Sequence, residues 1–173
     1  MMGRALLIIG ALATLGFLAS GVLGYLLKGP GDPAMSRHVF VALASCLAQL
    51  FSHCWILIYL LITGRAIRET VEESGLEARY LEEAGGFRKS VTPWAVAAVV
   101  LGLATFLLGG AAASGEVKSR IHHSLFFVTV AVQGWSLWRE SRALRSNQAL
   151  IDEIDRRQAG PTAAGLSGQE VAG

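Results

Sequence analysis

The sequence predicts an all-α protein, a bundle of four transmembrane helices in one domain, and three observations support this class. The 173 residues are 53% hydrophobic and 16% charged, which is too apolar for an ordinary soluble domain. Four stretches contain no Asp, Glu, Lys or Arg, and each is about as long as the roughly 17 to 25 residues that cross a bilayer. Every other segment is too short to form an independent catalytic domain. The uncharged stretches are Ala5–Leu27, His38–Gly64, Ser90–Gly115 and Ile121–Trp138.

These stretches define the expected domain organisation. We predict a single integral membrane domain over residues 1–157, with spans at 5–27, 38–63, 93–110 and 121–138, a cytoplasmic loop at 64–90 and a disordered tail at 158–173.

The first span follows Arg4 and is longer than the apolar region of a secretory signal, so we expect an uncleaved anchor. Gly16, Ser20 and Gly24 recur at four-residue spacing along it. Such a row of small residues lets a second backbone approach closely. A turn rich in Gly and Pro at 28–37 then ends this helix.

The second span, 38–63, leads into a strongly charged segment between Gly64 and Ser90. Apolar residues recur only loosely there, so we expect one or two short amphipathic helices in the loop, ended by Gly85 and Gly86.

The third span begins where Thr92 can cap a helix, Pro93 suits its first turn and Trp94 suits a membrane interface. The fourth span ends near Trp138, but the helix is expected to continue into the cytoplasm to about Arg157. This extension is predicted by Leu137, Leu144 and Ile151, which recur every seven residues.

Basic residues predict the topology. With the N-terminus inside, eleven Lys and Arg fall on the inner side and four on the outer side, so both termini are predicted to be cytoplasmic in a multi-pass protein of the plasma (inner) membrane. The net charge is only +2, which gives no reason to expect a nucleic-acid partner. The outer four are Lys28, Arg37, Lys118 and Arg120.

Polar residues form matching patterns on the second and fourth spans. Counted from the first histidine of each, they stand at offsets of 7, 11 and 14 residues. At about 100° per residue these positions fall within a roughly 60° arc, so each helix carries one narrow polar stripe. The stripes are His38, Ser45, Gln49 and Ser52, and His122, Thr129, Gln133 and Ser136.

Stripes 84 residues apart predict a parallel internal repeat of two helical hairpins, whose polar faces turn toward one axis. The alternative interpretation is that the Ser, Thr and Gln residues only make interhelical hydrogen bonds, which are worth about 0.6 kcal/mol each.

The two leading histidines predict a cofactor site. His38 and His122, at equal depth on two helices, are candidate metal ligands on either side of one haem b. His123 competes with His122 but points about 100° away, so only one of them should face the bundle. Ala42 leaves room for a porphyrin edge. Candidate contacts to the faces of the porphyrin are Phe40, Phe126 and Phe127. Candidate partners of the two haem propionates are Arg37, Lys118 and Arg120. The alternatives are histidines that meet water at helix ends, or a different metal.

His53 lies roughly 22 Å below His38 along the same helix, and the matching position on the fourth span is Leu137. With Gln49 and Gln133 close by, it suits a quinone head group or a proton relay. The alternative is a histidine satisfied by one of these neighbours. No acidic residue lies within a predicted span, which argues against a carboxylate-driven pump.

Two functions follow from this pattern. The first is a haem-binding electron-transfer or quinone-interacting subunit, and the second is a non-catalytic membrane scaffold or assembly subunit that docks other membrane subunits. In neither case do we expect an enzyme on its own. In general plan, a short bundle with histidines near one surface is similar to the four-helix membrane cytochromes of the b type, although this likeness covers no contiguous motif.

Overall fold

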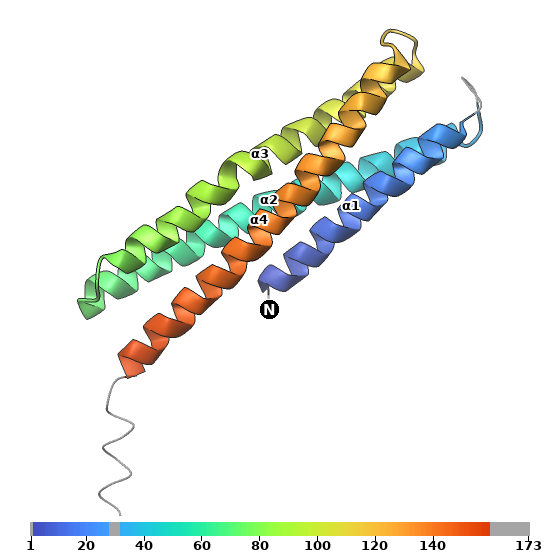
Figure 1. Cartoon of the computed structure of the whole chain (residues 1–173). Helices are drawn as coiled ribbons and strands as arrows, with labels where there is room; N and C mark the ends of the chain where they lie inside the picture. Colours follow the sequence, from blue (N-terminus) through green and yellow to red (C-terminus); the bar gives the residue numbers. More distant parts are fainter. Residues whose placement is uncertain (1, 28–31, 160–173) are drawn as a thin grey trace, which may run out of the picture.

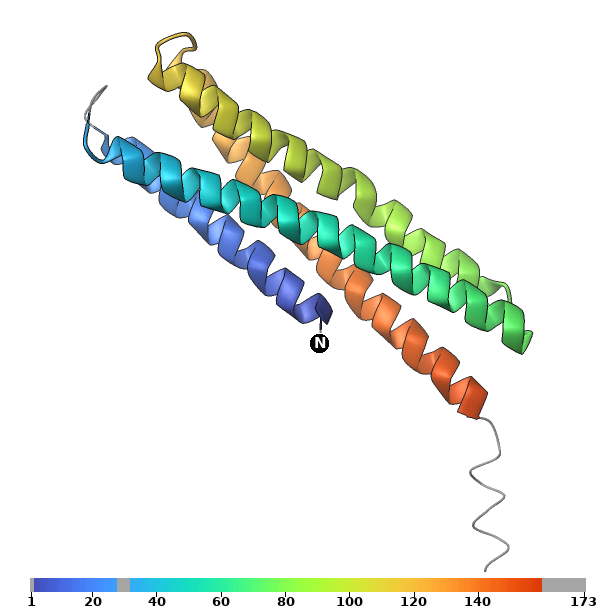
Figure 2. The same cartoon turned by 180° about the vertical axis from the view of Figure 1, so that it is seen from behind.

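A computed structural model describes residues 2–27 and 32–159, and in these ranges it consists of four long α-helices without a strand. Consecutive helices are antiparallel, and α4 also packs against α1, so the order around the bundle is α1, α2, α3, α4 (Figures 1 and 2). The helices α2 and α4 therefore lie diagonally opposite each other and run in the same direction. The bounds are α1 Met2–Leu26, α2 Met35–Ser74, α3 Arg79–Ala113 and α4 Ser119–Ala159.

The predicted all-helical, four-helix class is confirmed, and α1, α2 and α3 are long and apolar enough to cross a membrane. The fourth span stays a prediction, because the uncharged stretch of α4 contains His122, His123 and Gln133 and is less apolar. Large apolar side chains cover the outside of the bundle, with Leu12 61% and Leu107 68% exposed. An apolar outer surface of this kind suits contact with lipid.

We expected the segment 64–90 to be a loop with one or two short helices, and this expectation is wrong. α2 runs on to Ser74, α3 starts at Arg79, and Gly75 ends α2 in the left-handed conformation with φ 64°. Gly85 and Gly86 lie inside α3. The helices continue because their apolar faces meet those of α4 in a core of Ile67, Val71, Tyr80, Ala84, Leu150 and Ile154.

This three-helix part, residues 64–90 and 145–159, is called the tip below. In Figure 1, α1 starts part of the way along the bundle and the other three helices continue past it. The extension of α4 beyond the predicted span is confirmed, since the helix ends at Ala159. The predicted tail lies outside the described residues from residue 160 onward.

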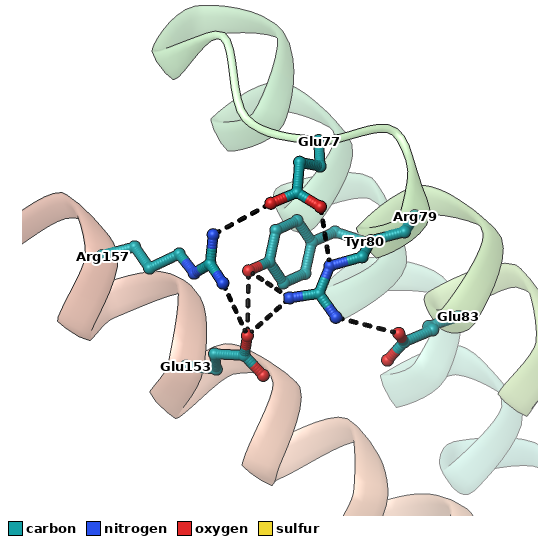
Figure 3. A network of polar contacts seen from close by, with 6 residues as sticks. All are labelled: Glu77, Arg79, Tyr80, Glu83, Glu153 and Arg157. Carbon is teal, nitrogen blue, oxygen red and sulfur yellow. Dashed lines mark hydrogen bonds and ion pairs between the residues drawn. The ribbon is translucent and has the colours of Figure 1, made fainter.

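A polar network closes the tip around the buried Tyr80 (Figure 3). The Tyr80 hydroxyl donates to Glu153 Oε1 at 3.0 Å, and Arg79 Nη2 donates to the same oxygen at 2.8 Å. Arg157 Nη1 lies 3.0 Å from Glu77 Oε1. The turn between α2 and α3 is thereby bound to the end of α4.

Pro93 does not stand in the first turn of a helix, and Thr92 does not cap one. Both lie well inside α3, where the Thr92 hydroxyl donates to the carbonyl of Arg88 at 2.8 Å. Proline removes a backbone donor from a helix. The carbonyl that lacks this donor is that of Lys89, four residues earlier, while Arg139 Nη2 on α4 donates to the neighbouring carbonyl of Ser90 at 3.1 Å.

The described residues support the predicted repeat of two hairpins. Thr63 bonds Asn147 at 3.1 Å, and Gln158 Nε2 donates to Ser74 Oγ at 2.8 Å. Both pairs are separated by 84 residues, so α2 and α4 face each other in one register. Every Ser, Thr and Gln of the two predicted stripes is buried.

Candidate functional site

A cavity of about 550 Å³ lies at the end of the bundle where α2 and α4 begin, and all four helices line it. We call it the histidine pocket, since His38, His122 and His123 are among its lining residues. Its volume lies within the roughly 300 to 1,000 Å³ of cofactor sites. The structure therefore brings the two predicted iron ligands to one cavity, from diagonally opposite helices.

The His38 ring is bonded to α1. Its Nδ1 lies 2.9 Å from the backbone carbonyl oxygen of Ser20 and 3.2 Å from the Ser20 hydroxyl. The small-residue row predicted on the first helix explains this close approach. A Cβ added to Gly24 would lie 3.0 Å from Cε1 of His38, so a side chain at this position would crowd the ring.

The His122 ring is held in the same way by α3. Its Nδ1 lies 3.1 Å from the backbone carbonyl oxygen of Thr105, and a Cβ added to Gly109 would lie 2.9 Å from its Cε1. Each hairpin thus pairs one histidine with a carbonyl and a glycine one turn apart on the preceding helix. Neither Thr105 nor Gly109 was singled out from the sequence, because the repeat is not visible in the identities of α1 and α3.

These bonds fix the tautomer of both rings. A carbonyl oxygen only accepts hydrogen bonds, so the proton of each neutral ring is on Nδ1. The lone pair is then on Nε2 of His38 and of His122. A histidine that binds a metal through one nitrogen usually donates its other N–H to a carbonyl or carboxylate, which is the arrangement found twice here.

The other residues predicted around a haem divide into two groups. Phe126 and Ala42 line the pocket as expected. Phe40 and Phe127 do not, because they are 72% and 58% exposed on the outside of the bundle. His123 also lines the pocket, with its ring 4.7 Å from that of Tyr25, whereas His122 bonds a carbonyl of the preceding helix.

The predicted propionate partners are not among the pocket-lining residues. Arg37, Lys118 and Arg120 are exposed around the same end of the bundle. Within the described ranges, no group of three or more His, Cys, Asp or Glu is placed to hold a metal ion. A metal in this pocket would accordingly need ligands beyond the protein, as haem iron has in its porphyrin.

A second polar cluster surrounds His53, which is 1% exposed in the core. Its Nδ1 lies 2.6 Å from Oε1 of Glu140, and its Nε2 lies 2.9 Å from Oε1 of Gln133. The alternative that a neighbouring residue satisfies His53 is therefore confirmed for Gln133. Both ring nitrogens are engaged, so a quinone at His53 would have to displace one of these partners.

Glu140 is the functional residue that the sequence reasoning missed. It is 0% exposed, yet it stands two residues beyond the predicted end of the fourth span, after the charged Arg139. Its offset from His122 is 18 residues, which continues the polar stripe by one more turn. If the spacing of the polar stripe is continued beyond Arg139, it predicts that Glu140 and then Asn147 lie on the same face of the helix.

The rest of the stripes bond to neighbouring helices. Gln49 Nε2 donates to the carbonyl of Ala98 at 2.7 Å, and the Ser52 hydroxyl donates to the carbonyl of Leu6 at 2.9 Å. Three buried side-chain polar atoms have no partner among the described residues. They are Gln49 Oε1, Gln133 Nε2 and Glu140 Oε2.

Comparison of the chain with protein-family models, curated proteins and solved structures found no match.

Proposed function

We propose that this protein is a membrane electron carrier that holds one haem b between His38 and His122. A single observation carries the proposal: two histidines from opposite helices line one cavity, and each is oriented by a carbonyl that leaves its Nε2 free. Two imidazole nitrogens supply the two axial positions of haem iron. When bound, such a group accepts and releases one electron at a time.

The shape of the histidine pocket fits a flat group. A planar ligand bound by one residue of α2 and one of α4 has α1 and α3 at its edges, because these helices occupy the other diagonal. Glycines stand among the lining residues on both of these helices, with Gly21 and Gly24 on α1 and Gly109 and Gly110 on α3. Neither cysteine lines the pocket, so the group is of the non-covalent b type.

Under this proposal, His53, Gln49 and Gln133 join the helices inside the core and do not bind a quinone. His53 has no free ring nitrogen, and Gln49 and Gln133 are each 1% exposed. By the predicted topology, the histidine pocket is near the outer surface of the membrane, and the tip is in the cytoplasm.

A second candidate function is a scaffold subunit without a cofactor. It is favoured by the bonds of Gln49 to α3 and of Ser52 to α1, because such bonds fix helix register whether or not a cofactor is present.

An absorption spectrum of the purified protein in detergent separates the two functions. We expect a Soret band and a sharp α-band on reduction, lost in His38→Ala and in His122→Ala. His123→Ala is the matched control and should keep both bands, since His123 lies beside Tyr25 and forms no carbonyl-bonded pair. A colourless protein with normal helix content, after expression with ample haem, would contradict the electron-carrier proposal and leave the scaffold.

A further inference from the structure

The His53–Glu140 pair is an acid and a base in contact inside the bundle, about 22 Å along α2 from His38. His53 is 1% exposed and Glu140 is 0% exposed. Burial makes a lone charge costly, and this pair is neutral overall only when it holds two protons. The number of protons held by the pair therefore sets the charge of this layer of the core.

We propose that His53 and Glu140 form a proton-binding site, whose affinity for one proton rises when an electron enters the histidine pocket. The coupling to the electron rests on the proposed function, whereas the proton site itself does not. Proton binding at this place needs no cofactor, because both titrating groups belong to the chain.

The hydrogen bonds define the two states of the site. Gln133 Oε1 faces His53 Nε2 at 2.9 Å, and an amide oxygen only accepts, so His53 carries a proton on Nε2. A second proton lies between Nδ1 and Glu140 Oε1. With both protons present the pair is neutral, which is the loaded state.

In the unloaded state the Nε2 proton is gone and the pair has a charge of −1. The ring then keeps its proton on Nδ1 and donates it to the Glu140 carboxylate. Gln133 can support this state as well, because its Nε2 has no partner in the structure and would donate to the ring after the amide turns over. Loading adds one proton from solution and involves no electron.

The surroundings leave this charge uncompensated. At this level α1 contributes Leu6 and Gly10, and α3 contributes Val91 and Ala95, none of which can ionise. On α4 the nearest cation is Arg139, whose Nη2 donates to the carbonyl of Ser90. Arg4 on α1 is exposed. Among the described residues Glu140 Oε2 has no donor, while the Ser136 hydroxyl donates to Glu140 Oε1 at 3.4 Å.

Polar contacts connect the pair with the histidine pocket. His122 bonds the carbonyl of Thr105, and the hydroxyl of Thr105 lies 2.6 Å from that of Thr129. Gln133, which bonds His53, stands one turn after Thr129 on α4. Polar side chains thus lie between the pocket and the pair, and charge at one end acts on the other through the core that separates them.

The size of the coupling follows from the separation of the charges. At about 22 Å and an effective dielectric constant of about 20, a unit charge at one site changes the equilibrium at the other by about fourfold. A tenfold change in the equilibrium constant corresponds to 59 mV, so a fourfold change corresponds to about 35 mV. The midpoint potential of the haem is lower by this amount when the His53–Glu140 site is unloaded at high pH.

The proton site is tested by infrared difference spectroscopy of the full chain between acidic and alkaline pH, in H₂O and in D₂O. We expect a band of the His53–Glu140 pair, from the imidazolium ring or the carboxylic acid according to which group holds the shared proton, that titrates in the wild type, is absent in Glu140→Gln and is retained in Glu73→Gln, an exposed control. If Glu140→Gln does not fold, Gln133→Leu keeps both titrating groups and should move the titration to another pH. A band that is missing from the wild type, or unchanged in these variants, overturns the site.

The coupling is tested by redox titration of the haem bands at several pH values. We expect the midpoint potential to fall by about 35 mV in total across the titration of the pair, and to lose this step in Glu140→Gln. A coloured protein whose potential has no such step overturns the coupling while the proposed function stands. A colourless protein overturns the proposed function and the coupling together, and the infrared titration then decides the proton site alone.

Discussion

At the scale of single residues, the position of each candidate iron ligand is set by two residues of the preceding helix. The carbonyls of Ser20 and Thr105 set the tautomers of His38 and His122, and the missing side chains of Gly24 and Gly109 make the space for the rings. A carbonyl that holds the ring N–H also raises the basicity of the other nitrogen as a ligand. The geometry of the histidine pocket is therefore set as much by α1 and α3 as by the histidines.

We expect Gly109→Ala to destabilise the protein by about 1 to 3 kcal/mol, because the new Cβ would lie 2.9 Å from the His122 ring. The matched control is Gly134→Ala on α4, whose added Cβ meets nothing within 4 Å. There the lower backbone entropy of alanine should stabilise the helix by about 0.5 to 1 kcal/mol. Denaturant unfolding of both variants in detergent measures this contrast, and equal stabilities would contradict the packing described for His122.

The contact between His53 and Glu140 predicts strong energetic coupling. His53→Leu or Glu140→Leu alone should cost about 3 to 5 kcal/mol of unfolding free energy, because each leaves the other group buried without its partner. The double variant should cost much less than the sum. A double-mutant cycle in detergent measures the difference, and additive effects would show that the two side chains do not interact.

At the scale of elements, the main feature is the parallel register of α2 and α4 across the bundle. Residues 84 positions apart bond each other at Thr63–Asn147 and at Ser74–Gln158, and the polar stripes lie between these pairs and the histidine pocket. Helices that are diagonal neighbours touch mainly through such long polar side chains. A rotation of either helix by one residue would separate all of these pairs together.

In a background without Cys46 and Cys54, we expect Thr63→Cys with Asn147→Cys to be joined by a short bifunctional thiol reagent, because the native side chains are 3.1 Å apart. Thr63→Cys with Gln148→Cys is the control, since Gln148 is exposed and bonds Asp152 on its own helix. Electrophoresis after unfolding and cleavage between α2 and α4 reveals the link. Efficient joining of the control pair alone would refute this register.

At the scale of the whole molecule, the bundle has a different character at each end. The histidine end encloses a cavity between four helices, whereas the tip is a solid three-helix core closed by the polar network around Tyr80 (Figure 3). Hydrogen bonding from the Tyr80 hydroxyl, together with the charges of Arg79 and Arg157, lowers the pKa of Glu153 below its ordinary value. The stability of the tip is consequently expected to depend on acid.

Because the folded-state pKa of Glu153 is depressed, its stabilising contribution is complete above the unfolded value of about 4.3 and is lost as the pH falls through the folded value. We expect the melting temperature of the wild type to fall more steeply on acidification below about pH 4 than that of Glu153→Gln. Circular dichroism measures both, and Glu73→Gln should keep the wild-type slope. Identical acid slopes in all three proteins would contradict the role given to Glu153.

Patterns that repeat along one helix were readable from the sequence. The polar stripes led by His38 and His122, the repeat of two hairpins and the small-residue row on α1 all follow from spacing. The structure buries the Ser, Thr and Gln residues of the stripes, and His38 and His122 line the histidine pocket. The continuous helices of the tip were not readable in this way. Their apolar residues are sparse on each helix and form a core only when α2, α3 and α4 lie side by side.

The sequence by itself determined the four helices and the faces that they bury, because hydrophobic and polar periodicity depends only on the geometry of one helix. Only the tertiary structure decided that Glu140 belongs to the core as the partner of His53, and which ring nitrogen of His38 and His122 is free. Hydrogen bonds between helices depend on their relative rotation and depth. These are set by packing between segments that are far apart in the chain.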